Sequence, residues 1–80
     1  MTAQEAHDIF KKANPKLTIT EMLNYSDKYY VITALENPNE NDFNDPYFAV
    51  DKKTGKITRY FPMDDFENFI DARQHRQVRM

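Results

Sequence analysis

The sequence contains no cysteine, no tryptophan, only one glycine and no long apolar run. Without cysteine, neither a disulfide nor a thiolate metal site can supplement the core, and a reducing compartment is permitted. No apolar run approaches the roughly 18 residues that a membrane-spanning helix needs. The N-terminal segment MTAQEAHDIF also lacks the basic and apolar regions of a secretory signal. We therefore expect a soluble, cytoplasmic protein with no membrane partner.

The chain also lacks an excess of basic residues. Its formal net charge is −2, whereas proteins that neutralise nucleic-acid phosphates normally carry a clear basic excess. One strip combines basic side chains with aromatic platforms on which a single strand could stack: Lys52, Lys53, Lys56 and Arg59 with Tyr47 and Tyr60. Lysines at a hairpin tip are usually solvated, so we expect no nucleic-acid partner.

Aromatic residues are abundant, with five Tyr and six Phe in 80 residues. A chain of this length forms one small domain, spanning residues 1–80, and buries only about 60% of the surface that it exposes when unfolded. Aromatic side chains bury a large area each and must supply much of the core. Self-association as a homodimer is a second source of stability for so small a core.

Residues 47–61, YFAVDKKTGKITRYF, form the segment around which the rest is arranged. Apolar and polar residues alternate over residues 47–50 and again over 57–61, which predicts two strands of a hairpin. The connection holds Gly55, the only glycine, at a place where a hairpin commonly needs positive φ. An isolated hairpin is marginal in water, so flanking segments must cover it.

Helices are predicted at both ends of the chain. Thr2 and Glu5 have the spacing of a capping box, and an apolar stripe continues from Ala3 to Ala13, where Asn14 and Pro15 end the helix. The second helix is predicted over residues 64–74, with Asp64 and Glu67 as a capping box. Its expected buried stripe is Phe66, Phe69 and Ile70, with Met63 as a further candidate. Residues 76–80 are expected to fray.

Two further strands are predicted between the first helix and the hairpin. Residues 17–25 alternate, with Leu17, Ile19, Leu23 and Tyr25 on the apolar face and Glu21 interrupting it. Residues 29–35 are dense in β-branched and aromatic side chains. A polar connection bracketed by prolines follows at residues 37–46. The fold class is therefore α+β, in the order α-β-β-β-β-α, an antiparallel meander sheet with two helices packed on one face.

No catalytic residue, cofactor site or metal site is predicted. Ser26 is the only serine and lies in a turn, and His7 and His75 are far apart in the sequence. Asp64 and Asp65 are neighbours on a helix and point in different directions. The acidic segment, residues 36–45, offers oxygen ligands of the kind that calcium takes, but it lacks the glycine and the bidentate glutamate of an EF-hand loop. The protein is therefore not expected to be an enzyme.

Partner binding is the remaining class of function. Tyrosines on whichever sheet face is not covered would form an exposed aromatic surface of the kind used by interfaces. The acidic segment could meet a basic partner. The candidate partner-binding residues are Tyr29, Tyr30, Glu40, Asp42, Phe43 and Asp45.

Residues 2–60 resemble a PepSY-like domain. The likeness rests on TAQEA opening a helix, a proline after it, a strand, a YYV strand and the closing segment AVDKKTGKI. The resemblance implies a non-catalytic binding module, in some members associated with restraining peptidases. The acidic segment and the second helix are additional to that pattern. The chain is also similar to small uncharacterised proteins of Gram-positive bacteria and their phages.

The sequence thus favours a non-catalytic protein-binding module, with the PepSY-like resemblance implying an inhibitor or accessory protein. The alternative is a phage-type accessory or counter-defence protein whose acidic segment meets nucleic-acid-binding machinery. Neither reading names the partner.

Overall fold

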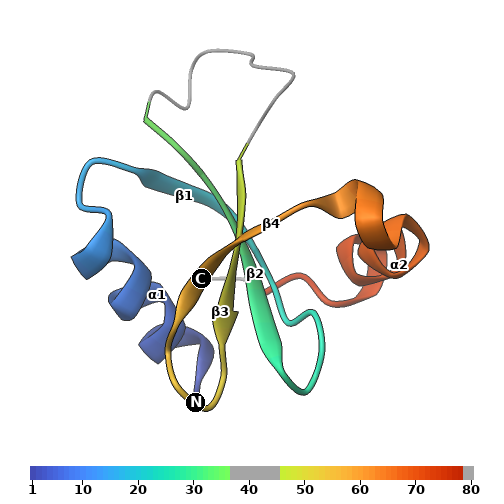
Figure 1. Ribbon diagram of the computed structural model, residues 1–80, viewed down its shortest axis with the longest axis horizontal. Helices are drawn as coiled ribbons and strands as arrows, with labels where there is room; N and C mark the ends of the chain where they lie inside the picture. The colour runs from blue at the N-terminus through green and yellow to red at the C-terminus, as the bar shows by residue number, and fades with distance from the viewer. Residues whose placement is uncertain (37–45, 79–80) are drawn as a thin grey trace.

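The computed structural model describes residues 1–36 and 46–78. Four strands form one antiparallel sheet in the order β1-β2-β3-β4, preceded by one helix and followed by a 3₁₀ turn and a second helix (Figure 1). The predicted class, element order and meander are confirmed. The elements are α1 (Ala3–Ala13), β1 (Thr18–Leu23), β2 (Tyr29–Leu35), β3 (Tyr47–Asp51), β4 (Ile57–Tyr60), η1 (Pro62–Asp65) and α2 (Phe66–His75).

The capping box at the start of α1 is present as predicted. Thr2 Oγ1 accepts from the Glu5 amide at 3.2 Å, and the Glu5 carboxylate accepts from the Thr2 amide at 3.3 Å. These bonds satisfy amides that a helix start leaves open. Ala6 and Phe10 are fully buried, so the apolar stripe of α1 faces the sheet.

The hairpin between β3 and β4 turns on Gly55, whose φ is +74°. Asp51 Oδ1 accepts from the amides of Lys53 at 2.7 Å and Thr54 at 2.9 Å. These hydrogen bonds hold the pKa of Asp51 below its usual value, and the bond from the Thr54 amide has the largest effect. The turn is therefore fixed by one glycine and one carboxylate, and the predicted conformational role of Gly55 is confirmed.

The two helices pack on opposite faces of the sheet, contrary to the prediction that they share one face (Figure 1). Phe10 of α1 packs against Phe48, with ring centroids 5.1 Å apart. Phe69 of α2 packs against Tyr47, also at 5.1 Å, and Phe48 and Tyr47 are neighbours on β3. The reason lies in the near-continuous apolar run of β2, since a strand that is apolar on both faces must be covered on both.

A β-bulge in β1 explains why its predicted apolar face is wrong. The register shifts between Ile19 and Glu21, so that Ile19 and Met22 both belong to the α1 side, while Leu23 belongs to the α2 side. A bulge reverses the alternation beyond it. Glu21 therefore does not interrupt a single apolar face; it lies opposite Thr33 and is 3.7 Å from Arg73.

The second helix begins later than predicted and without the capping box. Asp64 and Asp65 belong to the 3₁₀ turn η1, and the Asp65 side chain makes no capping bond to the helix backbone. The buried residues of α2 are Phe69 and Ala72, whereas Phe66 is 54% exposed and Met63 83% exposed. Pro62 fixes the backbone where β4 leaves the sheet and a new turn begins.

Residues 76–78 run along β1, although residues 76–80 were expected to fray; residues 79–80 lie outside the described residues. The Asn24 amide donates to the Arg76 carbonyl at 2.9 Å, and the Val78 amide donates to the Met22 carbonyl at 2.8 Å. Leu23 and Gln77 form an isolated bridge. Residues 76–78 therefore cover the end of the β1 edge, and Val78 packs against the α1-side core.

Candidate functional site

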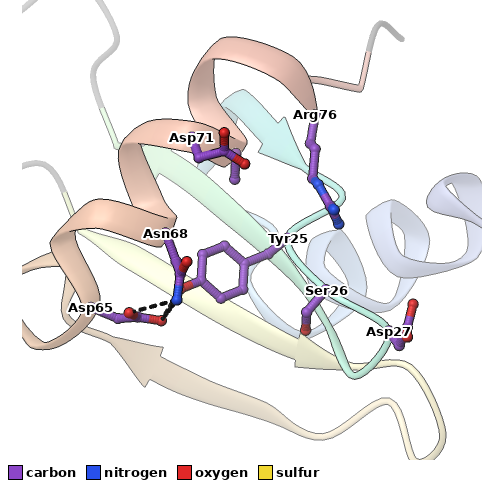
Figure 2. A pocket seen from close by; sticks show the side chains of 8 residues that line it. Tyr25, Ser26, Asp27, Asp65, Asn68, Asp71 and Arg76 are labelled. Atoms are coloured by element: carbon purple, nitrogen blue, oxygen red, sulfur yellow. Dashed lines mark hydrogen bonds between the residues drawn. The ribbon is translucent and has the colours of Figure 1, made fainter.

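A hollow of about 400 Å³ lies between the turn that joins β1 to β2 and the inner side of α2 (Figure 2). The turn contributes Tyr25, Ser26 and Asp27. The 3₁₀ turn and α2 contribute Asp65, Asn68, Asp71, Ala72 and Arg76. Three carboxylates and one guanidinium thus surround the hollow, and most of its lining is polar.

Tyr25 connects the β1–β2 turn to the start of α2. Its hydroxyl donates to Asp65 Oδ2 at 2.5 Å, and the Asn68 side-chain amide donates to the two Asp65 oxygens at 2.8 and 3.1 Å. Figure 2 shows Tyr25 reaching under α2 toward this pair. The Tyr25 ring also meets Tyr60 edge-on, with centroids 5.3 Å apart. We call Tyr25, Asp65 and Asn68 the tyrosine clasp.

The protonation states within the clasp follow from its geometry. Burial raises the pKa of Tyr25, and its hydrogen bond to Asp65 raises it further. The hydrogen bonds from Tyr25 and then Asn68 hold the pKa of Asp65 below its usual value. Burial also raises the pKa of Tyr60. At neutral pH the clasp therefore holds a neutral Tyr25 beside an ionised Asp65, and this hydrogen-bonded pair joins the β1–β2 turn to the start of α2.

Three large apolar side chains stand in solvent just before and at the start of α2. Phe61 is 56% exposed, Met63 is 83% exposed and Phe66 is 54% exposed. We call these three residues the apolar patch. They lie within six positions of one another in a chain of which 30% is charged. Three exposed large apolar side chains this close together in the sequence are candidates for an interaction site, whereas single exposed ones need no explanation.

Arg59 lies beside the apolar patch and is held by aromatic rings. Its guanidinium is 5.3 Å from the centroid of Phe48 and 6.0 Å from that of Phe61. Such stacking limits the orientations of an otherwise flexible side chain. The positive charge therefore has a defined place at the end of β4 that leads into the patch.

The structure divides the predicted partner-binding residues. Tyr29 is 37% exposed, whereas Tyr30 is 7% exposed and belongs to the α1-side core. Lys52 lies 4.5 Å from the Tyr30 ring centroid and covers it further. A buried Tyr30 offers no surface to a partner. Glu40, Asp42, Phe43 and Asp45 lie outside the described residues.

The sequence did not identify the clasp or the apolar patch. Tyr25 was predicted as a strand residue, and Phe66 and Met63 were predicted as core. The signal that was available is Pro62, because a proline at the end of a strand can begin a 3₁₀ turn that rotates the following side chains away from the sheet. The contact between Tyr25 and Asp65 joins residues 40 positions apart and has no local signature.

Within residues 1–36 and 46–78, no group of three or more histidine or acidic side chains is placed to hold a metal ion. No helix in the same part of the chain is long and apolar enough to cross a membrane.

Comparisons of this chain with protein families, with characterised proteins and with solved structures give no significant match.

Proposed function

We propose that the protein is a non-catalytic binding module that docks another protein through the apolar patch. The observation that carries this proposal is the exposure of Phe61, Met63 and Phe66 on one short connection. Residues that dominate interfaces are enriched in large side chains surrounded by polar ones. The PepSY-like resemblance, which implies a binding module, points to the same class of function.

The elements next to the patch are anchored to the sheet, which favours binding. Phe69 is 4% exposed and anchors α2 to the sheet, and the tyrosine clasp ties Asp65 to the β1–β2 turn. Exposed residues on a supported element lose little conformational freedom when a partner binds. The backbone that carries Met63 and Phe66 is therefore attached to the rest of the domain at Asp65, which lies between these two residues, and at Phe69, which follows them.

Site-specific photo-crosslinking tests the proposal. A benzoylphenylalanine residue in place of Met63 should join the protein to one partner in cells of its source, because position 63 is 83% exposed. The same crosslinker in place of Lys16, an exposed residue in the turn between α1 and β1, is the control. A discrete product at position 63 and none at position 16 is the expected result.

A second variant separates binding from folding. In the protein that carries the crosslinker at position 63, Phe66→Ser should reduce the amount of crosslinked product about tenfold. A large side chain that becomes buried by the partner contributes about 1.4 kcal/mol or more to binding. Its melting temperature should stay near that of the parent, since Phe66 is exposed. Equal products from positions 63 and 16, or no effect of Phe66→Ser, would contradict the proposal.

The alternative of an accessory protein that meets nucleic-acid-binding machinery depends on acidic residues outside the described part of the chain. No described residue favours it over the apolar patch. It stays an alternative identity for the partner that the crosslinking would capture.

A further inference from the structure

We propose that the partner is bound as an added strand along β4, with a carboxylate opposite Arg59 and an apolar side chain against Phe61. This inference rests on the proposed function and specifies the form and charge of the bound segment. It is carried by three properties of β4, namely its edge position, its outward-facing backbone groups and its side chains.

The two edges of the sheet differ. The end of the β1 edge is covered by the chain itself, through the bonds that Asn24 and Val78 make with Arg76 and Met22. At the other edge β4 pairs with β3, and no described segment pairs along its outer side. An uncovered strand edge is a template for a further strand.

The hydrogen-bond pattern identifies which backbone groups β4 presents outward. The Asp51 amide donates to the Lys56 carbonyl at 2.9 Å, so Lys56 faces β3. Because facing alternates along an antiparallel pair, Thr58 and Tyr60 also bond inward, and Ile57 and Arg59 direct their amides and carbonyls outward.

The outward pattern continues one residue beyond β4. Phe61 keeps an extended backbone, with φ −118° and ψ 104°. The Phe61 carbonyl accepts from the Asp64 amide at 3.1 Å and is therefore occupied. The Phe61 amide is the last of the outward-facing backbone groups that begin at Ile57. The segment from Ile57 to Phe61 can therefore pair with a short extended peptide that ends beside Phe61, the first residue of the apolar patch.

The side chains on this edge select the charge of the peptide. Ile57, Arg59 and Phe61 project to the same face, because alternate residues of a strand do so. Arg59 has no carboxylate within ion-pair distance among the described residues, and Lys56 adds a second positive charge beside the turn. A carboxylate opposite Arg59 complements this edge, and an apolar residue two positions away on the peptide reaches Phe61.

A second copy of β4 is a poorer occupant of this edge. If two copies paired through β4, the strand of each copy that carries Lys56 and Arg59 would lie against the same basic strand of the other copy. Like charges across a strand pair are destabilising. An acidic segment of another protein that also carries an apolar residue meets the charge of Arg59 and the side chain of Phe61 together. The proposal therefore commits to that occupant.

Selection from a phage-displayed library of random octapeptides, with the full chain as bait, tests the proposal. We expect the selected peptides to share an acidic and an apolar residue at positions i and i+2. A synthetic peptide of the selected sequence should slow amide hydrogen exchange at Ile57 and Arg59 at least about tenfold, because their amides gain strand partners.

Two matched variants separate charge from backbone pairing. Arg59→Glu should weaken binding of the acidic peptide at least about tenfold, whereas Lys16→Glu, the same change of charge at an exposed residue of the turn between α1 and β1, should leave binding unchanged. The chain is short enough for chemical synthesis, which allows N-methylation of the Arg59 amide. That change keeps the guanidinium and the bonds to β3, and it should abolish slowed exchange and weaken binding at least about tenfold.

Several outcomes would overturn strand addition. One is the absence of any selected peptide; another is selected peptides without the acidic preference or without protection of Ile57 and Arg59. A doubling of mass in sedimentation, with protection of the Arg59 amide in the free protein, would show that a second copy occupies the edge. Crosslinking at position 63 that persists with Arg59 N-methylated would leave the apolar patch as a docking site and remove strand addition alone.

Discussion

At the scale of single residues, the contact between Tyr25 and Asp65 is the one whose loss should be visible in the pH dependence of stability. Tyr25→Phe removes the hydroxyl that donates to Asp65 at 2.5 Å and keeps the ring against Tyr60. We expect the free energy of unfolding to fall by about 1 kcal/mol at pH 7. The hydrogen bond is only partly buried, so water can bond to Asp65 in its place in the variant.

The sign of the pH effect follows from the two pKa shifts. The pKa of Asp65 is lowered by folding, so its contribution is present above the unfolded value of about 4 and is lost as the pH falls through the folded value. The pKa of Tyr25 is raised by folding, so its contribution is present below about pH 10 and is lost at higher pH. Urea unfolding from pH 3 to 11 should show both limbs flattened in Tyr25→Phe. Limbs as steep as those of the wild type would refute the assignment.

Gly55 gives a second test at this scale. Gly55→Ala places a Cβ at φ +74° and 3.1 Å from Ile9 Cδ1. The left-handed backbone alone should cost about 1–2 kcal/mol of stability. Ile9→Val removes the Cδ1 atom, so Gly55→Ala in that background isolates the backbone cost from the contact. If Gly55→Ala has no effect in either background by thermal unfolding, the conformational role of Gly55 is wrong.

The residue-scale features differ in how far the sequence could reveal them. Two features were predicted because they depend on neighbours within a few positions. They are the capping box of Thr2 and Glu5 and the turn that contains Gly55. The clasp could not be predicted, because Tyr25 meets Asp65 only after the sheet and α2 have assembled. The same is true of Arg59, whose rings come from Phe48 on the next strand and Phe61 on its own.

At the scale of elements, α2 carries two phenylalanines with opposite roles. Phe69→Ala should cost about 3–5 kcal/mol of stability, because Phe69 is 4% exposed and packs against Tyr47. Phe66→Ser, one helical turn earlier, should change stability by about 0.5 kcal/mol or less. Denaturant unfolding of the two variants measures the difference. Similar losses would show that Phe66 belongs to the core and that the apolar patch is smaller than proposed.

The predictions at this scale failed where one element depends on another. Existence and order of the strands were predictable, since alternation and β-branched residues are local. The face of each residue in β1 was not, because a bulge between Ile19 and Glu21 reverses the alternation without a glycine or proline to mark it. The sides of the helices were readable in principle from β2, where Tyr30, Val31, Ile32 and Thr33 are buried consecutively.

At the scale of the whole molecule, the sheet separates two small cores that neither helix could maintain alone. Phe10 with Ile32 lies on the α1 side, and Phe69 with Val31 lies on the α2 side. Ile32 and Val31 are neighbours on β2, so the same strand supplies both cores. Loss of one core removes the support on which the other is built, and we therefore expect the domain to unfold in one cooperative step.

Substitutions at two neighbouring residues of β2, one facing each core, test this coupling. Ile32→Val deletes one methylene on the α1 side, and Val31→Ala deletes two methyl groups on the α2 side, where each parent side chain is at most 1% exposed. The first should cost about 0.5–1.5 kcal/mol and the second somewhat more. Amide signals of α1 and of α2, followed through urea titration, should share a single midpoint in each variant, because a weakened side draws on the stability of the whole sheet. A midpoint that falls for α2 alone in Val31→Ala would mean that the two cores fold independently, and that the apolar patch lies on an element able to detach from the sheet.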